Sequence, residues 1–168
     1  MHSTMILIEP TIQTRFSRRL RLRTLSDFLE SAAAAAKLRG EVSVLLAGDA
    51  HIRRLNRQFR RKDKPTDVLS FPAPEVPGKF VIAGDLAISV ETAARQAEEL
   101  GHPLAMELQI LILHGLLHLA GYDHEQDSGQ MARREATLRR RLGLDHGLIE
   151  RSAAASPVRR KRREARQP

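Results

Sequence analysis

The sequence predicts an α+β fold in which one small mixed β-sheet of about four strands is covered by about five helices. Three observations support this prediction. A chain of 168 residues suits one domain with a real core, or one domain plus a tail. Short apolar runs bounded by Pro, Gly or Asp alternate with longer segments of helical periodicity. In chain order the segments read strand, helix, strand, helix, strand, strand and then three helices, without an internal repeat.

The first half of the chain is expected to contain two strands and two helices. Pro10 closes the first strand, and Thr24 with Asp27 three residues later has the arrangement of a capping box at a helix start. In the second helix the apolar residues Ile52, Leu55 and Phe59 recur on one side. The expected elements are strand 5–9, helix 24–40, strand 42–47 and helix 50–61.

The second half is expected to contain two strands followed by three helices. Ser89 can cap the first of these helices, and Gly101 ends it. Asp127 or Ser128 is expected to cap the last one. The expected elements are strand 66–71, a Pro-rich loop 72–78, a strand from 80 or 81 to 89, helix 90–100, a helix from about 104, and a helix ending at 142.

Charge divides the chain into a body and a tail. Residues 151–168 hold seven Lys or Arg against one Glu, whereas residues 1–150 hold 21 against 19. We therefore expect a folded domain at 1–150 and a basic, disordered tail at 151–168. The RRKRR run resembles a nuclear import signal, but a solvated tail that binds polyanions is the favoured interpretation.

The composition also limits cofactors and targeting. The chain has no cysteine, so a metal must be held by His or carboxylates, and disulfides are excluded. The longest apolar run, 108–120, is too short to span a bilayer, and no secretory signal is recognisable at the N-terminus. We expect no membrane association.

The stretch ELQILILHGLLHLAGYDH contains a candidate metal site. His114 and His118 stand one helical turn apart, and Gly121 can end the helix and turn the chain so that His124 returns toward them. Three imidazoles with a fourth position open form the ligand set of a catalytic zinc. The alternative is core histidines in an apolar helix, but three buried imidazoles without partners would be costly to desolvate.

The spacing H-x3-H-x2-G-x2-H is that of the metzincin peptidases. In those enzymes a Glu follows the first His and serves as general base, whereas this chain has Gly115. The sequence therefore predicts a metzincin-like three-His zinc helix and turn without the carboxylate needed for amide hydrolysis.

The segment 53–64 is strongly basic, with seven Lys or Arg and a single acid. A charged helix face is often merely solvated, and that interpretation stays open for this segment taken alone. Beside a metal site without a peptidase base, a patch of this charge favours binding to a phosphate backbone.

Three segments, LNRQFRRKDKPTDVLSFP, AGDLAIS and HGLLHLAGYDH, together resemble the bacterial YbeY-type endoribonucleases, the 16S rRNA maturation factors. The resemblance covers about residues 6–144. It implies a cytoplasmic, zinc-dependent endoribonuclease that cleaves single-stranded RNA in 16S rRNA maturation and ribosome quality control. It implies one Zn²⁺ per chain, with RNA and ribosomal particles rather than DNA as partners.

Carried over by position, the resemblance implies that His114, His118 and His124 are the zinc ligands. It implies that Arg60 acts in RNA binding and catalysis. At position 59 this chain has Phe where the family more usually has Tyr. Either side chain is expected to fill the same apolar slot.

The chemistry and the function leave alternatives. Zinc can lower the pKa of a bound water toward about 7 or assist attack by the substrate 2′-hydroxyl, with Arg60 neutralising charge at phosphorus. Asp85 and Asp123 are either partners of the ligand imidazoles or simple turn carboxylates. A non-enzymatic zinc-containing ribosome-assembly factor is the main alternative function, and a metzincin-like peptidase is a weaker one.

Overall fold

The computed structural model describes residues 3–74, 77–78 and 81–144, so the tail expected at 151–168 lies outside the described residues. The described elements are, in chain order, β1 (Thr4–Ile8), α1 (Pro10–Leu20), α2 (Leu22–Ala35), β2 (Glu41–Ala47), α3 (Asp49–Arg60), β3 (Val68–Pro72), β4 (Ile82–Ser89), α4 (Val90–Leu100), α5 (Leu104–Leu119) and α6 (Gln130–Arg141).

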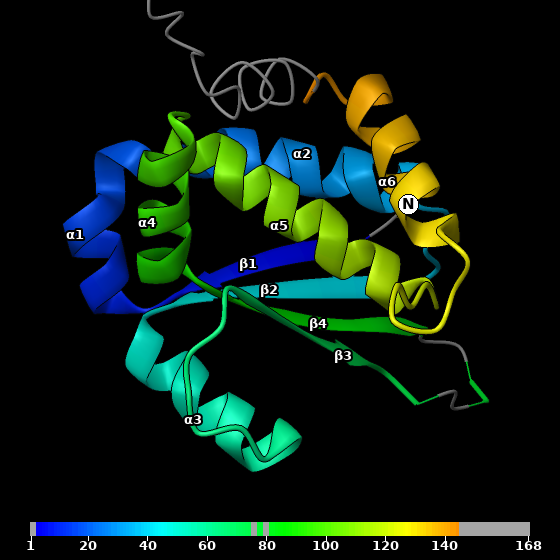
Figure 1. Cartoon of the computed structure of the whole chain (residues 1–168), viewed down its shortest axis with the longest axis horizontal. Coiled ribbons are helices and arrows are strands. Elements are labelled where there is room, and N and C mark those ends of the chain that lie inside the picture. Colours follow the sequence, from blue (N-terminus) through cyan, green and yellow to red (C-terminus); the bar gives the residue numbers. More distant parts are fainter. Residues whose placement is uncertain (1–2, 75–76, 79–80, 145–168) are drawn as a thin grey trace, which may run out of the picture.

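The four strands form one mixed sheet in the order β1-β2-β4-β3. β1, β2 and β4 are parallel, whereas β3 pairs antiparallel with β4 at the edge. Figure 1 shows α3 on one face of this sheet and the other helices on the opposite face. The predicted α+β class with a small mixed sheet is therefore confirmed.

The two faces of the sheet bury different sets of side chains. In β2, Val44 and Leu46 belong to the main core beneath the helices, whereas Ala47 belongs to a smaller cluster with Ile52 under α3. This alternation follows from the two-residue period of a strand. Burying one such Val, Leu or Ile side chain stabilises the fold by about 1.5–3 kcal/mol, so both clusters contribute to holding α3 and the other helices on the sheet.

Helix α5 crosses the centre of the main core. It packs against α2 and α4 and against the strands β3 and β4, which explains why its sequence is apolar nearly all round. At Gly115 the helix approaches β4 so closely that an added Cβ would lie 2.8 Å from a methyl group of Leu86. Position 115 therefore faces the sheet, and the missing peptidase glutamate has a packing reason.

The sequence prediction missed one helix, so the fold has six rather than about five helices among the described residues. The arginine-rich segment after β1 is helix α1, which begins at Pro10, where the absent N–H of proline costs nothing. Its buried residues Ile12, Phe16 and Leu20 recur every fourth position. The three arginines among them, Arg15, Arg18 and Arg19, made this period hard to recognise in the sequence.

Two local expectations were wrong. Helix α2 starts at Leu22 after Arg21 in the left-handed conformation, and no capping side chain is present there, so the expected Thr24 cap does not form. Phe59 was expected to fill an apolar slot, yet its side chain is 55% exposed and meets Phe71 edge to face. No described helix alone is long and apolar enough to cross a membrane; by length and composition only the pair α4–α5, bent by 114°, qualifies.

Candidate metal centre

Three histidines converge where α5 ends. His114 and His118 lie on its last two turns, and Gly121 follows with φ 93°, donating its N–H to the carbonyl of His118. This left-handed turn brings His124 back, as the sequence predicted. One ligand nitrogen from each histidine lies within 4.8 Å of the other two. His114 and His118 are half-buried and His124 is exposed, so the group is open to solvent on one side.

Hydrogen bonds to the rings orient their free nitrogens. His118 Nδ1 donates to the carbonyl of Tyr122 at 3.0 Å, and His114 Nδ1 lies 3.5 Å from a carboxylate oxygen of Glu135. When both rings are neutral, each carries a lone pair on Nε2, and these two nitrogens are 3.2 Å apart. Two facing lone pairs repel unless a cation lies between them. Nitrogen ligands on a tetrahedral ion such as zinc are about 3.3 Å apart, so the residues present fit a metal.

The surroundings keep His118 neutral. Burial lowers its pKa, and the neighbouring His114 lowers it further, against the opposing effect of the Tyr122 carbonyl. Neutral imidazole is the form that binds metals. The lowered pKa therefore favours the metal-binding form of His118.

Glu135 supports the centre from α6. Its side chain is mostly buried and also accepts a hydrogen bond from Arg139 at 3.0 Å. Burial raises the pKa of the Glu135 carboxyl, but contacts with His114 and Arg139 outweigh burial and hold the pKa below its usual value. An ionised carboxylate behind a ligand imidazole fixes the orientation and raises the basicity of the ring.

The sequence left open whether Asp85 and Asp123 have this supporting role or are simple turn carboxylates. Asp123 accepts a hydrogen bond from the N–H of Glu125 and so stabilises the turn that contains His124. Asp85 lies on β4 in register with Phe71, on the α3 side of the sheet. Neither forms a hydrogen bond with the three histidines in the described part of the chain. Glu135 follows His124 by eleven residues, a spacing with no motif to reveal it.

Arg60 lies at the last position of α3 and is exposed. Its guanidinium donates to the carbonyl of Ser70 on β3 at 2.8 Å, while the Ser70 hydroxyl donates to the carbonyl of Gly115 at 3.4 Å. Ser70 thus connects Arg60 with the helix residue next to His114. No hydrogen bond joins Arg60 directly to a histidine of the centre among the described residues, and its catalytic role stays a prediction.

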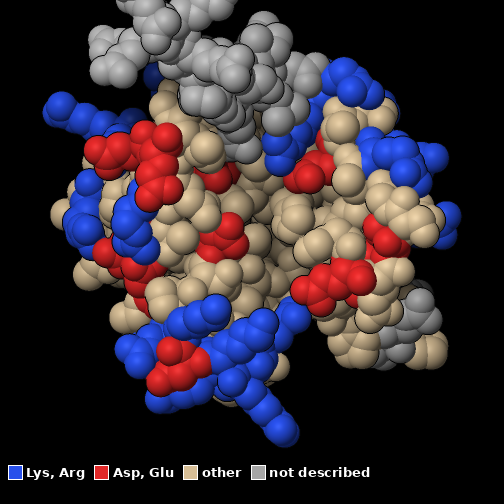
Figure 2. Space-filling model, in the orientation of Figure 1, with Lys and Arg blue, Asp and Glu red and all other residues tan. Residues whose placement is uncertain are grey.

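The basic patch on and after α3 is largely unpaired. Its only acid, Asp63, accepts two hydrogen bonds from Arg53 at 2.9 and 3.0 Å. The other six cations form no ion pair within the described residues. They are Arg54, Arg57, Arg60, Arg61, Lys62 and Lys64. Figure 2 shows these side chains gathered over α3, at the bottom of the view.

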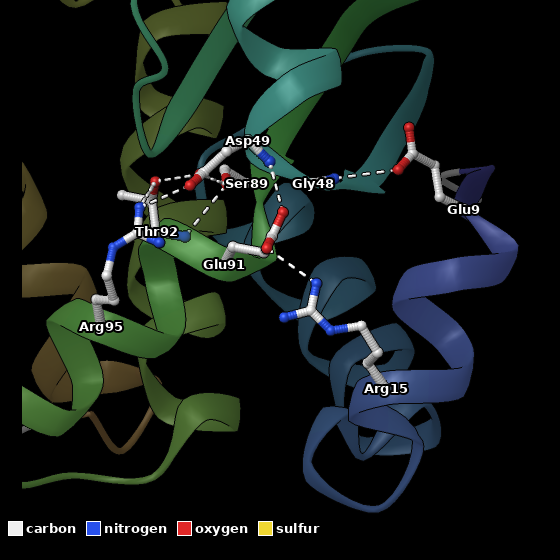
Figure 3. A network of polar contacts seen from close by, with 8 residues as sticks. All are labelled: Glu9, Arg15, Gly48, Asp49, Ser89, Glu91, Thr92 and Arg95. Carbon is white, nitrogen blue, oxygen red and sulfur yellow. Dashed lines mark hydrogen bonds and ion pairs between the residues drawn. The ribbon is translucent and has the colours of Figure 1, made fainter.

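A second polar cluster lies where the parallel strands β1, β2 and β4 end (Figure 3). Parallel sheets usually bind ligands beyond the carboxyl ends of their strands. Here Glu9 and Glu91 accept the N–H groups of Gly48 and Asp49, while Asp49 accepts hydrogen bonds from Ser89, Thr92 and Arg95. These contacts cap α3 and join it to α4. Because these carboxylates already accept hydrogen bonds from the protein's own groups, we assign the cluster a structural role. We call the cluster of Glu9, Asp49 and Glu91 with their partners the joint.

Comparison with known proteins gives concordant results. A family model described as Endoribonuclease YbeY matches residues 9–143. An Endoribonuclease YbeY from Koribacter versatilis is 54% identical over 143 residues, covering 84% of this chain and 91% of that protein. One from Solibacter usitatus is 57% identical over 107 residues, covering 64% and 69% respectively. A solution structure of a Thermotoga maritima protein superposes with a TM-score of 0.54 at 26% identity, covering 96% of this chain and 100% of that one.

Proposed function

This chain belongs to the endoribonuclease YbeY family, and on that premise we propose that it is a zinc-dependent endoribonuclease specific for single-stranded RNA. The proposed ligands of one Zn²⁺ per chain are His114, His118 and His124. The proposed role is 16S rRNA maturation and ribosome quality control, on ribosomal particles in the cytoplasm. The observation that carries the metal part of the proposal is the pair of Nε2 atoms 3.2 Å apart, each with its Nδ1 engaged elsewhere.

The protein's own groups prepare the site for such an ion. Glu135 and the Tyr122 carbonyl hold two imidazoles with their lone pairs converging, and the exposed His124 leaves an approach for substrate. A divalent ion bound there would polarise a phosphoryl oxygen or lower the pKa of water toward about 7. No side chain at position 115 is available as a peptidase base, which supports phosphodiester rather than amide cleavage.

Arg60 is the proposed catalytic side chain outside the metal ligands. The contact with the Ser70 carbonyl uses one donor of its guanidinium and leaves others for phosphate oxygens. Arginine grips phosphate through parallel N–H groups and stays charged at all relevant pH values. Arg60 would therefore neutralise the charge that grows at phosphorus during cleavage.

The surface around α3 suits a single strand of RNA. Its unpaired cations can contact successive phosphates, and the exposed ring of Phe59 lies among them. Cationic grooves with aromatic side chains bind single strands, because phosphates meet cations while unpaired bases stack on the rings. This arrangement supports RNA as substrate.

The deciding experiment combines metal analysis of the purified protein with a cleavage assay on single-stranded rRNA fragments. We expect zinc near one equivalent and cleavage that stops on chelation and returns with zinc. The variant His114→Ala, purified in parallel, controls for contaminating nucleases and should be inactive. RNA binding without any cleavage by the metal-loaded wild type would refute the endoribonuclease proposal and favour a non-enzymatic assembly factor.

A further inference from the structure

An open groove of about 750 Å³ lies directly beside the three histidines. Leu119, Ala120 and Tyr122 form part of its wall, and these residues surround the turn that follows His118. The carbonyl of Tyr122 is the one that orients the His118 ring. The groove therefore borders the turn that orients a histidine of the candidate metal centre.

The rim of the groove is cationic. Lys37, Arg39 and Arg134 line it, and no Asp or Glu is among its described lining residues. Lys37 and Arg39 are exposed on either side of the buried Leu38, because the chain alternates as it leaves α2. Neither Lys37 nor Arg39 forms an ion pair within the described chain. Arg134 donates one hydrogen bond to the carbonyl of Ala35, and its other N–H groups remain available. Cations without carboxylate partners are available for an anionic ligand.

The floor of the groove is apolar. It contains small side chains such as Ala73 and Ala83, together with Val81 and Ile82, which are 56% and 57% exposed. Exposed apolar surface with a cationic rim matches the chemistry of an unpaired nucleotide. The flat faces of its base and ribose can lie on apolar side chains while its phosphate meets Lys or Arg.

The α3 patch contacts the edge strand β3, and the groove begins at the residue that follows this strand. Arg60 contacts Ser70, whereas the groove is lined by Ala73, three residues further on. At about 3.3 Å per strand residue this separation is about 10 Å along the strand. In Figure 1 the carboxyl end of α2, which Lys37 and Arg39 follow in the chain, lies on the same side of the molecule as α6 and the end of α5. One strand of RNA can therefore contact both cationic surfaces.

We propose that this groove, with Lys37 and Arg39 at its rim, binds the nucleotides of the RNA strand that flank the cleavage site on the side away from the α3 patch. This proposal rests on the proposed function, because it takes the substrate to be single-stranded RNA. The groove would be a second phosphate-binding surface beside the α3 patch. The RNA strand would then be bound on both sides of the phosphate that is cleaved at the metal centre.

The test compares two doubly substituted proteins with the wild type, all loaded with metal. The groove variant is Lys37→Asn with Arg39→Gln; Asn suits position 37, which has φ 57°. The control variant is Arg23→Gln with Arg140→Gln, which removes two exposed charges outside the groove. Stopped-flow anisotropy with a labelled single-stranded RNA records binding before cleavage, and initial rates give kcat and KM.

We expect the groove variant to bind RNA roughly tenfold more weakly than the control variant. The slope of log affinity against log salt should fall by about 1.4, the value for two lost phosphate contacts on a single strand. KM should rise with kcat little changed, since neither side chain is placed at the reacting phosphate. Unchanged circular dichroism and zinc content would show that folding and the centre are intact, and Arg39→Gln alone gives a smaller change of the same kind.

The outcomes separate the groove proposal from the proposed function. Equal binding, slope and KM in the groove and control variants, with normal cleavage by the wild type, would overturn the groove proposal and leave the nuclease standing. Wild-type protein that binds RNA in a Lys37- and Arg39-dependent manner but never cleaves it would support the groove and overturn the nuclease. Photocrosslinks from 4-thiouridine to residues 81–83 would support the groove, whereas crosslinks confined to α3 would contradict it.

Discussion

At the scale of single residues, the centre depends on contacts that hold the imidazoles as well as on the imidazoles themselves. Glu135 touches His114, and its carboxylate is kept ionised by His114 and Arg139. We expect Glu135→Gln to weaken zinc binding by about 10–100-fold, since a neutral amide orients and polarises the ring less well. Chelator competition measures the affinity directly.

Glu99→Gln is a suitable control for this prediction, because Glu99 is exposed on α4 and is not among the groups in contact with the centre. An equal zinc affinity for both variants would show that Glu135 merely packs α6 against α5.

Arg60 should separate turnover from metal binding. Because its guanidinium is proposed to meet the reacting phosphate, Arg60→Ala should lower kcat on the order of 100-fold while the zinc content stays at the wild-type level. Arg54→Ala, on the same helix and also exposed, should instead change mainly the salt dependence of RNA binding. Loss of zinc from Arg60→Ala would contradict a role at the phosphate and indicate a structural one.

The sequence predicted the histidines but not their support, for a physical reason. His114, His118 and His124 are linked by local geometry, namely one helical turn and one left-handed glycine turn, and local geometry can be inferred from spacing. Glu135 reaches His114 only because α6 packs back onto α5. That contact is tertiary, and a single sequence carries no spacing rule for it.

At the scale of elements, the packing of α5 on β4 depends on Gly115. Alanine is the better helix former by about 1 kcal/mol, yet its Cβ would press on the fully buried Leu86. Overpacking of this kind costs about 1–3 kcal/mol, so we expect Gly115→Ala to unfold at lower urea concentration than the wild type.

Gly78→Ala serves as the matched control for Gly115→Ala, because a Cβ at position 78 would meet nothing within 4 Å. Were Gly115→Ala as stable as the wild type, the close approach of α5 to β4 would be in doubt.

The joint around Asp49 should make stability depend on pH. Partial burial raises the pKa of Asp49, but hydrogen bonds from Ser89, Thr92 and Arg95 outweigh it, so the pKa lies below its usual value. A carboxyl of this kind stabilises the fold above its unfolded pKa of about 3.9, and the contribution is lost as the pH falls through the folded pKa. Asp49→Asn should therefore cost about 1–2 kcal/mol at pH 7 and progressively less below pH 4.

Urea unfolding of Asp49→Asn and wild type at pH 7 and pH 3.5 measures this difference. Asp27→Asn, on the exposed side of α2, is the control. A difference of the same size at both pH values would mean that the Asp49 contacts do not depend on its charge.

Element prediction succeeded where local signals agreed. Helix α4 begins and ends as predicted, because Ser89 accepts the N–H of Thr92 and Gly101 adopts φ 71°. It failed at α1, where Pro10 was taken as the end of a strand although it also starts a helix. Both roles of proline are physically sound, and only the burial of Ile12, Phe16 and Leu20 decides between them.

At the scale of the whole molecule, a bound ion should stabilise the packing of the segment from His124 to α6 against α5. The centre unites the end of α5 with His124, and Glu135 connects it to α6. An ion that binds only the folded state at 100 times its Kd stabilises by about 2.7 kcal/mol, so zinc should raise the Tm and chelation should lower it. In His114→Ala the Tm should not respond to zinc; a response equal to that of the wild type would place the ion elsewhere.

The joint around Glu9, Asp49 and Glu91 lies at the carboxyl ends of the parallel strands, whereas Leu119, the residue after His118, lies against Gly84 near the amino end of β4. The stabilising joint and the candidate metal centre thus lie at opposite ends of the strands of one sheet. Enzymes whose reactive groups sit in the least stable part of the fold often lose turnover when they are made more robust. If the proposed metal centre is the site of cleavage, substitutions that strengthen the joint should raise the Tm without lowering kcat.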